Sequence, residues 1–324
     1  MRLIRRIRSL FNPEHFQGWG RKSKYFEGWY FKVVSADEGS AFAIIPGVAI
    51  DTDGKGQSFV QVLDGRNIAA VYHKFDFDKF IASTRHFNVS INNNHFSEDS
   101  ISLDLPELKG KLIFSGNVRW PKPWYSPGIM GPYSFVPFME CYHSIVSMDH
   151  SITGKLEHSG RMIDFNGGRG YIEKDWGTSF PEGYIWLQTN HFDKPGISIK
   201  TSVAKIPWMR SSFVGFISGI WLGDRLVRFT TYNGSLLRKV DADKDRVEIV
   251  IENKIHRLEI LVSRDSSASL VSPVGGLMDG RIEESMSSGI EVNLDDLKAG
   301  RSVYSGKGRN VAVEVAGKVE EILV

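Results

Sequence analysis

The densest run of ionisable residues in this sequence is an acid, a base and a second acid, Glu173, Lys174 and Asp175. A tryptophan and a glycine follow directly, and a strand is predicted over residues 184–192. In an extended strand alternate side chains share a face, so one face here carries aromatic rings together with two amides. That face consists of Tyr184, Trp186, Gln188, Asn190 and Phe192.

A strand face of this composition differs from an ordinary apolar core face. Buried amides need hydrogen-bond partners, because an unmet amide costs about 1–3 kcal/mol. Aromatic rings with a few polar groups are typical of the wall of a ligand cavity. The residues are equally consistent with a network that only holds Lys174 and Asp175 in place. The pattern therefore indicates ligand recognition, with a structural network as the alternative.

A second group of ionisable residues lies in segment 137–154, which contains Glu140, His143, Asp149 and His150. The segment is strand-like, and on a strand His143 and Asp149 share a face but stand about 20 Å apart. They therefore cannot form a local pair. Histidines with carboxylates could suggest a metal site, but neither an HxH nor an HExxH spacing is present. We expect no metal.

Nucleophilic catalysis is not indicated by the sequence. There is no GxSxG elbow, and the run GGRG at 167–170 is interpreted as a turn because no helix is predicted after it. Cys141 is the single cysteine, which excludes an internal disulfide and a multi-thiolate metal site. A lone cysteine is more often a small apolar filler than a nucleophile.

Short strands are the elements that must position these groups. Apolar or alternating runs separated by turn clusters recur along the whole sequence. Long amphipathic helical stretches are nearly absent, and segment 76–83 is a candidate for a short helix. Five prolines in segment 117–137 predict a long irregular loop, of the kind that serves as a lid or a binding element. The rhythm predicts an all-β fold of sandwiches or barrels, with a domain boundary near residues 192–196.

The strand predicted over residues 28–34 places Trp29 and Phe31 on one face. Two large aromatic side chains on one face favour a position in the core. Glu27 stands directly before this strand and is predicted to be either a turn residue or an inward-pointing acid.

Composition excludes several classes of protein. The 324 residues carry a formal net charge of +2, without the basic excess of a nucleic-acid-binding protein, so no nucleic-acid partner is expected. Aromatic residues make up 12% of the protein, which suits a β-rich fold that binds a hydrophobic ligand.

The first eleven residues mix four arginines with apolar side chains. This pattern is a candidate amphipathic arm for peripheral membrane contact, with a segment packed on the domain as the alternative. No run in the sequence is apolar enough to span a bilayer. We expect the protein to lie in the cytoplasm, where the arm could attach it to a membrane surface.

The run EKDWGTSFPEGYIWLQTNHF at 173–192 resembles a segment of the tocopherol cyclase family of the form EKNWGxxFPxxWxWxQxNxF. FEGWYFK at 26–32 matches the opening of that family, and Glu140 and residues 157–160 fall in register with its FEPHW…IEWDG stretch. Residues 306–317 are similar to its AALEVGG stretch. The resemblance is therefore ordered and spans nearly the whole sequence.

The sequence departs from the plant-type pattern at three positions. Asp175 stands where that pattern has Asn, Tyr184 where it has Trp, and His143 where it has Trp. These differences bear on the substrate more than on the fold.

The resemblance implies two lipocalin-like β-barrel or sandwich domains with few short helices, residues 1–194 with the basic arm and residues 195–324. It also implies cofactor-free, isomerase-type chemistry on a hydrophobic isoprenoid. A carbon–carbon double bond of a prenyl group is protonated, and a phenol oxygen then captures the tertiary cation. Alkene protonation requires a carboxylic acid that burial keeps protonated. Aromatic faces stabilise the cation by about 0.5–2 kcal/mol each, and water must be excluded until the ring closes.

The resemblance also suggests roles for individual residues. We predict that Asp175 is the proton donor and that Lys174 tunes or pairs with the acids. The alternative donors are Glu173, Glu140 and Glu27. The residues predicted to bind the substrate are Trp29, His143, Trp176, Trp186, Gln188 and Asn190. Within that set, the two amides would orient the polar head of the ligand.

Two functions from different classes follow. The first is a cyclase or hydratase-like enzyme, favoured because the run of charges at 173–175 is costly for a simple carrier. The alternative is a non-catalytic carrier of hydrophobic ligands, since lipocalin-like barrels frequently only bind. A purely structural role is the weaker third interpretation. Carboxylates that point to solvent would favour the carrier.

Overall fold

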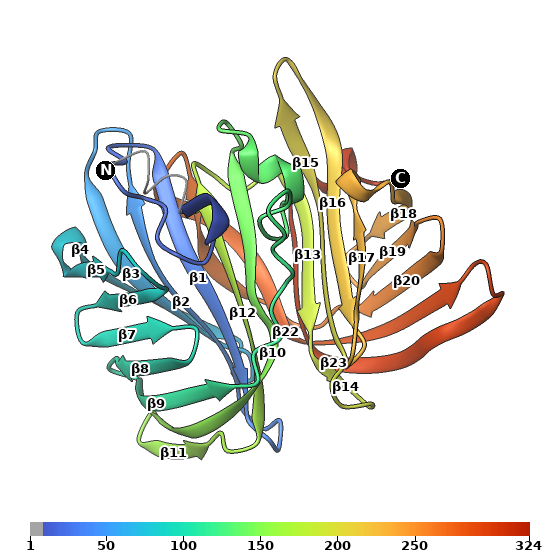
Figure 1. The fold of residues 1–324 in the computed structure, drawn as a ribbon. Coiled ribbons are helices and arrows are strands. Elements are labelled where there is room, and N and C mark those ends of the chain that lie inside the picture. Colours follow the sequence, from blue (N-terminus) through green and yellow to red (C-terminus); the bar gives the residue numbers. More distant parts are fainter. Residues whose placement is uncertain (1–8) are drawn as a thin grey trace. The chain divides into compact units, whose positions relative to one another are not determined.

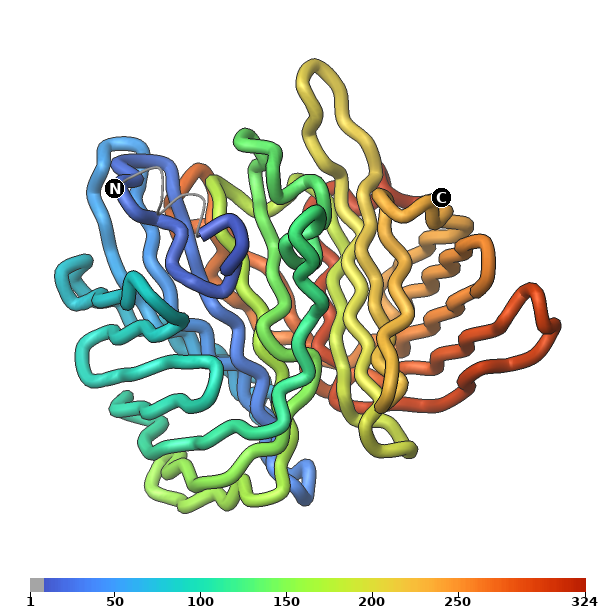
Figure 2. The backbone as a smooth tube through the Cα atoms, in the orientation of Figure 1, coloured from blue at the N-terminus to red at the C-terminus, as the bar shows by residue number. Residues whose placement is uncertain are grey.

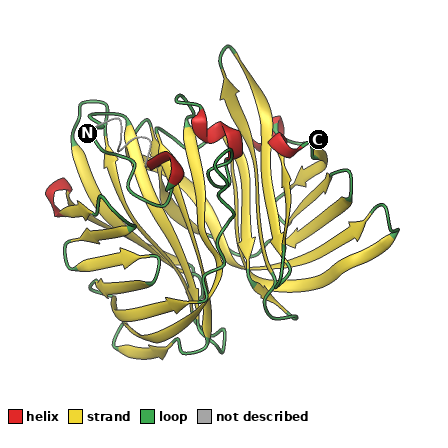
Figure 3. Ribbon diagram, in the orientation of Figure 1, coloured by secondary structure: helices red, strands yellow, loops and turns green. Residues whose placement is uncertain are grey.

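The computed structural model describes residues 9–324 and consists almost entirely of strands (Figure 1). Residues 1–8, which hold most of the predicted amphipathic arm, lie outside the described residues. The few short helices are clear in Figure 3 and include η1 (Phe77–Lys79), η2 (Gly131–Phe135), η3 (Thr231–Asn233) and η4 (Val319–Glu321). The predicted all-β fold with few short helices is confirmed. Among residues 9–324, no helix is long and apolar enough to cross a bilayer.

Two compact units make up the protein. Unit 1 comprises Met1–Phe180 and Leu270–Arg281, and unit 2 comprises Pro181–Ser269 and Ile282–Val324. These units differ from the predicted domains at residues 181–194 and at the returning segment 270–281. Residues 183–192 belong with unit 2 because their strands pair with strands of the second sheet.

Within the described residues, the first twelve strands form one antiparallel sheet. Its order is β4-β3-β2-β1-β12-β10-β9-β8-β7-β6-β5, with β11 paired to β10. The strands are β1 (Tyr25–Val34), β2 (Ala41–Ile50), β3 (Gly56–Asp64), β4 (Ala69–Asp76), β5 (Phe80–Ala82), β6 (Asn88–Ile91), β7 (Asn94–Ser97), β8 (Ser100–Asp104), β9 (Leu108–Ser115), β10 (Cys141–His158), β11 (Arg161–Asp164) and β12 (Gly168–Gly177). The long loop predicted at 117–137 connects β9 to β10 and contains η2.

One face of this sheet encloses the hydrophobic core of unit 1. Alternate residues of β1 and β12 point into it, among them Trp29, Phe31 and Ile172. Trp29 stacks on Phe87 with ring centroids 5.5 Å apart, and it is fully buried. The period-two pattern of the sequence produces this face, and it leaves the intervening residues of β1 and β12 for the opposite face.

Unit 2 is built on the second antiparallel sheet, which runs in the order β17-β16-β15-β13-β23-β22-β20-β19-β18. Its strands are β13 (Gly183–Thr189), β14 (His191–Phe192), β15 (Ser198–Trp208), β16 (Ser211–Trp221), β17 (Leu226–Thr230), β18 (Leu236–Ala242), β19 (Arg246–Glu252), β20 (His256–Ser263), β21 (Ala268–Val274), β22 (Leu277–Asp296) and β23 (Arg301–Gly317). The long β22–β23 hairpin is the red part of the trace in Figure 2. Apolar side chains such as Ile185 and Leu187 form the hydrophobic core of unit 2.

The hairpin 270–281 returns to complete unit 1. Gln61 on β3 accepts a hydrogen bond from the backbone N–H of Val271 at 2.8 Å and donates to its carbonyl at 3.3 Å. The backbone N–H of Gly276 donates to the Thr178 carbonyl at 2.8 Å. Met278 packs against an apolar cluster that contains Phe26. Residues far apart in the sequence therefore finish the same unit.

His150 on β10 is a buried histidine in the packed interior of unit 1. Its Nδ1 lies 3.1 Å from the Ser147 hydroxyl, and its ring lies 4.5 Å from the ring centroid of Phe114. Burial, and to a lesser extent the charge of Arg169, lowers the pKa of His150 to about 3. The folded protein therefore holds this side chain neutral at neutral pH.

This histidine is expected to make stability depend on pH. Between the ordinary value of 6.5 and about 3, the unfolded protein binds a proton at His150 that the folded protein does not. Its stabilising contribution is complete above pH 6.5 and is lost as the pH falls, by up to about 1.4 kcal/mol per pH unit. Urea unfolding at several pH values should show a flatter dependence for His150→Gln than for wild type. Parallel curves would contradict this.

Candidate active site

The predicted acids lie on β12, in the middle of the unit 1 sheet, between β1 and β10. Directly opposite residues of antiparallel strands share a face of the sheet. Asp175 is opposite His143 of β10, and Glu173 is opposite Tyr30 of β1. The pairing register therefore brings His143 to the same face as both acids, on the side away from the core.

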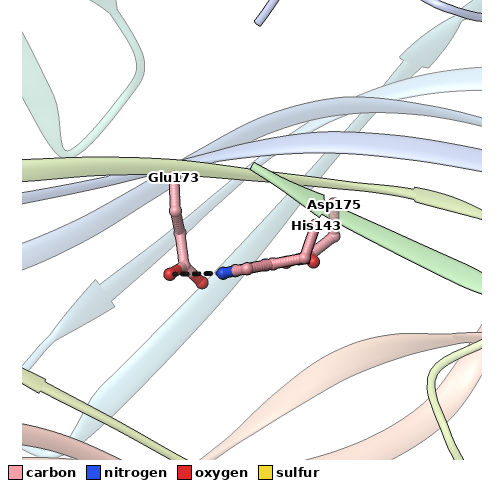
Figure 4. A group of neighbouring side chains, drawn as sticks. All are labelled: His143, Glu173 and Asp175. Carbon is pink, nitrogen blue, oxygen red and sulfur yellow. Dashed lines mark hydrogen bonds and ion pairs between the residues drawn. The ribbon is translucent and has the colours of Figure 1, made fainter. Parts of the chain in front are cut away.

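His143 lies between the two carboxyl groups (Figure 4). Its Nδ1 is 2.7 Å from Oδ1 of Asp175, and its Nε2 is 3.5 Å from Oε2 of Glu173. Tyr171 on β12 donates its hydroxyl to the same Glu173 oxygen. The four side chains thus form a continuous series of polar contacts.

Burial differs along this series. Tyr171 is fully buried and Glu173 is 4% exposed, whereas the Asp175 side chain is 23% exposed. Burial raises the pKa of Tyr171 well above its usual value. The Tyr171 hydroxyl therefore keeps its proton at neutral pH and acts as a hydrogen-bond donor. The end of the series formed by Tyr171 and Glu173 is the end that is shielded from water.

The contacts limit how protons can be arranged. A neutral imidazole has one N–H, so when Nδ1–H donates to Asp175, Nε2 is an acceptor for the O–H of a protonated Glu173. A protonated imidazole would donate instead to two carboxylates. In both arrangements the shared proton would lie between His143 and Glu173, and since Nε2 makes no hydrogen bond within residues 9–324 at the 3.5 Å separation, sharing it requires a closer approach of the two groups.

An apolar cluster of Phe26, Ala49 and Phe59 shares this unit, with Cys141 and Met278 packed against it. The Cys141 sulfur also lies 3.9 Å from Oδ1 of Asp175. Cys141 thus packs among apolar side chains at the edge of the polar group, in keeping with the predicted filler role.

Lys174 lies on the opposite face of β12, the face that carries the core. Its Nζ pairs with Oε1 of Glu27 at 2.6 Å, and both side chains are fully buried. It also donates to the carbonyls of Pro13, at 2.8 Å, and His15. Burial lowers the pKa of Lys174, and the Glu27 charge opposes that shift. Lys174 therefore pairs with Glu27 and not with Glu173 or Asp175.

Glu27 is surrounded by hydrogen-bond donors. The Tyr25 hydroxyl donates to it at 2.5 Å, and the backbone N–H groups of Gln17 and Gly18 donate at 2.9 and 3.0 Å. With Lys174 as a further donor, a proton on Glu27 would displace one of these partners. This environment suits a carboxylate that anchors residues 13–18 on the sheet, and it does not suit a proton donor.

The other candidates within unit 1 occupy different places. Trp29 fills the core, with its Nε1–H donating to the Glu14 carbonyl at 2.9 Å. Trp176 is half-buried on the Lys174 face and stacks on Tyr142 with centroids 5.4 Å apart. Glu140 is half-buried directly before β10, where its carbonyl accepts from the Thr178 N–H.

Three predicted ligand-binding residues belong to unit 2. Trp186 and Gln188 lie on β13 and Asn190 directly follows it, all buried. Their strand turns Ile185 and Leu187 to the core, so these three occupy the non-core face as the alternation predicts. On that face Gln188 is opposite Lys200 of β15.

The grouping of His143 with both acids was not predicted from the sequence. Part of the grouping can be predicted, because Tyr171, Glu173 and Asp175 are alternate residues and therefore share one face of a strand. The position of His143 depends on the pairing of β10 with β12, 32 residues further along the sequence, and β10 carries irregularities after Ile145.

His143, Glu173 and Asp175 offer ligand atoms within 4.8 Å of one another, so a metal ion is worth testing at this group. The two carboxyl groups contact different ring nitrogens of His143, and one ion bound to one nitrogen would leave one of those contacts unused. We expect dialysis against EDTA to leave turnover and thermal stability unchanged. A loss that zinc or iron restores would instead identify a metal centre.

Comparisons with known proteins place the protein in a family. A family model described as tocopherol cyclase-like matches residues 114–317, which include β10, β12 and β13. The protein is 27% identical to the chloroplastic tocopherol cyclase of Zea mays over 144 residues, 42% of this protein and 30% of the maize protein. It is 23% identical to the probable chloroplastic tocopherol cyclase of Oryza sativa subsp. japonica over 328 residues, 83% of this protein and 69% of the rice protein.

The fold has a counterpart among solved structures. CghA, in its crystal structure with Sch210972, superposes with a TM-score of 0.57 over 90% of this protein and 88% of CghA. The sequences are 11% identical, so this likeness concerns the fold. The family model covers more than half of the sequence, and the protein therefore belongs to the tocopherol cyclase-like family.

Proposed function

We propose that this protein is an acid catalyst for intramolecular cyclisation of a prenylated phenol, quinol or related isoprenoid. The observation that carries the proposal is the Glu173–His143–Asp175 group, in which an imidazole lies between a buried and a partly exposed carboxyl group beside an apolar cluster. Alkene protonation needs a proton donor held in a water-poor place. Membership of the tocopherol cyclase-like family supports the same class of reaction.

Glu173 is the proposed proton donor, in place of Asp175, which the sequence favoured. Burial favours the neutral form of a carboxyl group, and Glu173 is the more buried of the two. Asp175 contacts the other imidazole nitrogen of His143 at 2.7 Å. Its proposed role is to orient the ring and resupply the proton.

The reaction balances without a redox partner. Glu173 transfers its proton to one carbon of the double bond, which leaves a tertiary cation on the other carbon. The phenol oxygen forms a C–O bond to that carbon and releases its own proton, which returns to Glu173 through His143. The product is an isomer of the substrate.

The test is incubation of the purified full-length protein with a prenylated hydroquinone, followed by liquid chromatography and mass spectrometry. Cyclisation gives a product of unchanged mass and altered retention, with one non-exchangeable deuterium when the reaction runs in D₂O. A product heavier by one water would identify a hydratase. Recovery of only unchanged, bound lipid would identify the carrier and overturn the proposal.

A further inference from the structure

Unit 2 contains an open groove of about 550 Å³ whose lining residues all belong to that unit. It lies where the start of β17, the start of β20 and the turn between β22 and β23 contribute side chains (strands labelled in Figure 1). Three arginines line it: Arg225, Arg228 and Arg301. No part of the proposed cyclisation uses this groove.

The arginines lack the partners that other cations of this unit have. Arg238 pairs with Glu252 at 2.7 Å, and Arg257 pairs with Glu259 at 2.7 Å. Among residues 9–324, by contrast, no ion pair or side-chain hydrogen bond is present for the three guanidinium groups of the groove. Three guanidinium groups around one acid leave a net positive charge in the groove, which attracts an anion.

Asp296 is the acid that lines the groove, and its carboxylate is already engaged. The backbone N–H groups of Ala299 and Lys298 donate to its Oδ1 at 2.9 Å, and these bonds, together with the nearby His256 and Arg301, lower the pKa of Asp296. His256 lies beside it, and burial lowers the pKa of that imidazole. At neutral pH the lining therefore combines three positive charges with one negative charge and a neutral hydrogen-bonding ring.

The groove also has an apolar part. Leu226, Val227 and Val303 line it beside the arginines; Val227 is buried in the unit 2 core, and Leu226 and Val303 are partly exposed. Guanidinium groups recognise phosphate oxygens by paired, charge-assisted hydrogen bonds. A ligand that uses both parts carries a phosphate head on an apolar body.

We infer that this groove binds an organic phosphate or diphosphate, with the anionic oxygens on the arginines and the apolar body on the partly exposed side chains of Leu226 and Val303. Two sources share this chemistry, a soluble phosphate ester and the headgroup of an anionic lipid. The inference does not depend on the proposed cyclisation.

Isothermal titration of the full-length protein with inorganic pyrophosphate and with monomeric decyl phosphate tests the site. Both are expected to bind, and decyl phosphate should bind more tightly than inorganic phosphate titrated in the same way, because it adds an apolar body. The double variant Arg228→Gln/Arg301→Gln should weaken both affinities by about tenfold for each arginine removed. Arg210→Gln, an exposed arginine in the β15–β16 turn of the same unit, is the matched control and should bind as wild type.

Vesicle sedimentation separates the two sources. Phosphatidylcholine vesicles with phosphatidic acid should retain wild type more than the double variant if a lipid headgroup is the source, and equally if it is a soluble ester. Unchanged thermal unfolding of the variants, which alter exposed side chains, shows that binding and not folding is measured. Failure of both soluble phosphates and the vesicles to bind, or equal binding of every probe by wild type and the double variant, would overturn the inference.

Discussion

Replacing Glu173 with glutamine is expected to lower kcat for cyclisation by about 10²- to 10⁴-fold, with little change in KM. The amide has the same shape and can still accept from Tyr171, but it has no acidic proton to transfer. Initial rates from chromatographic product analysis measure the effect. Glu157→Gln, an exposed glutamate on β10, should retain the wild-type rate.

The Asp175→Asn variant separates the two acids. If Asp175 orients His143, its loss should lower kcat by about tenfold or somewhat more, less than the loss of the donor. If Glu173→Gln reacts at the wild-type rate and Asp175→Asn is inactive, the proton comes from Asp175, as the sequence predicted. Equal activity of wild type and both variants would remove this group from the mechanism.

Replacing Lys174 with methionine is expected to lower the free energy of unfolding by about 3–5 kcal/mol. The substitution leaves the Glu27 carboxylate buried without its cation and removes the Nζ–H groups that hold the Pro13 and His15 carbonyls. Urea unfolding at pH 7 measures the loss. The variant should also free residues 13–18 for early proteolysis, because this pair anchors them.

Two further variants test the origin of that loss. Glu27→Gln/Lys174→Met removes both charges and should cost less than the sum of the single changes, because no unpaired buried charge remains. Lys205→Met breaks solvent-exposed pairs with Glu182 and Glu321 in unit 2 and should change the free energy of unfolding little. A Lys174→Met protein as stable as Lys205→Met would show that the buried pair contributes nothing.

Local pattern was sufficient for the fold class and for one face of the site. Period-two runs between turn residues predict strands, and the short helix expected within 76–83 is the single turn η1, which β5 follows directly. The alternation along β12 places Glu173 and Asp175 together and Lys174 opposite, a separation already contained in the spacing of these residues.

Non-local pairing decided the rest of the site, and no local pattern encodes it. His143 reaches the acids because β10 pairs with β12. The register of this pairing shifts at bulges near Ser147. Lys174 meets Glu27 because β1 pairs with β12 on the other side. The unit boundary also follows from pairing, since β13 joins β15 and β23 and residues 270–281 return to unit 1.

The returning hairpin also sets the order of events during synthesis. Unit 1 is incomplete when Phe180 leaves the ribosome, because residues 270–281 follow about a hundred residues later. At about 5–20 residues per second, that interval lasts on the order of 5–20 s. Throughout it, the Gln61 amide lacks its Val271 partner and the Phe26 cluster lacks Met278. A nascent polypeptide arrested before residue 270 therefore presents an uncovered apolar patch, which makes it a natural client for a chaperone.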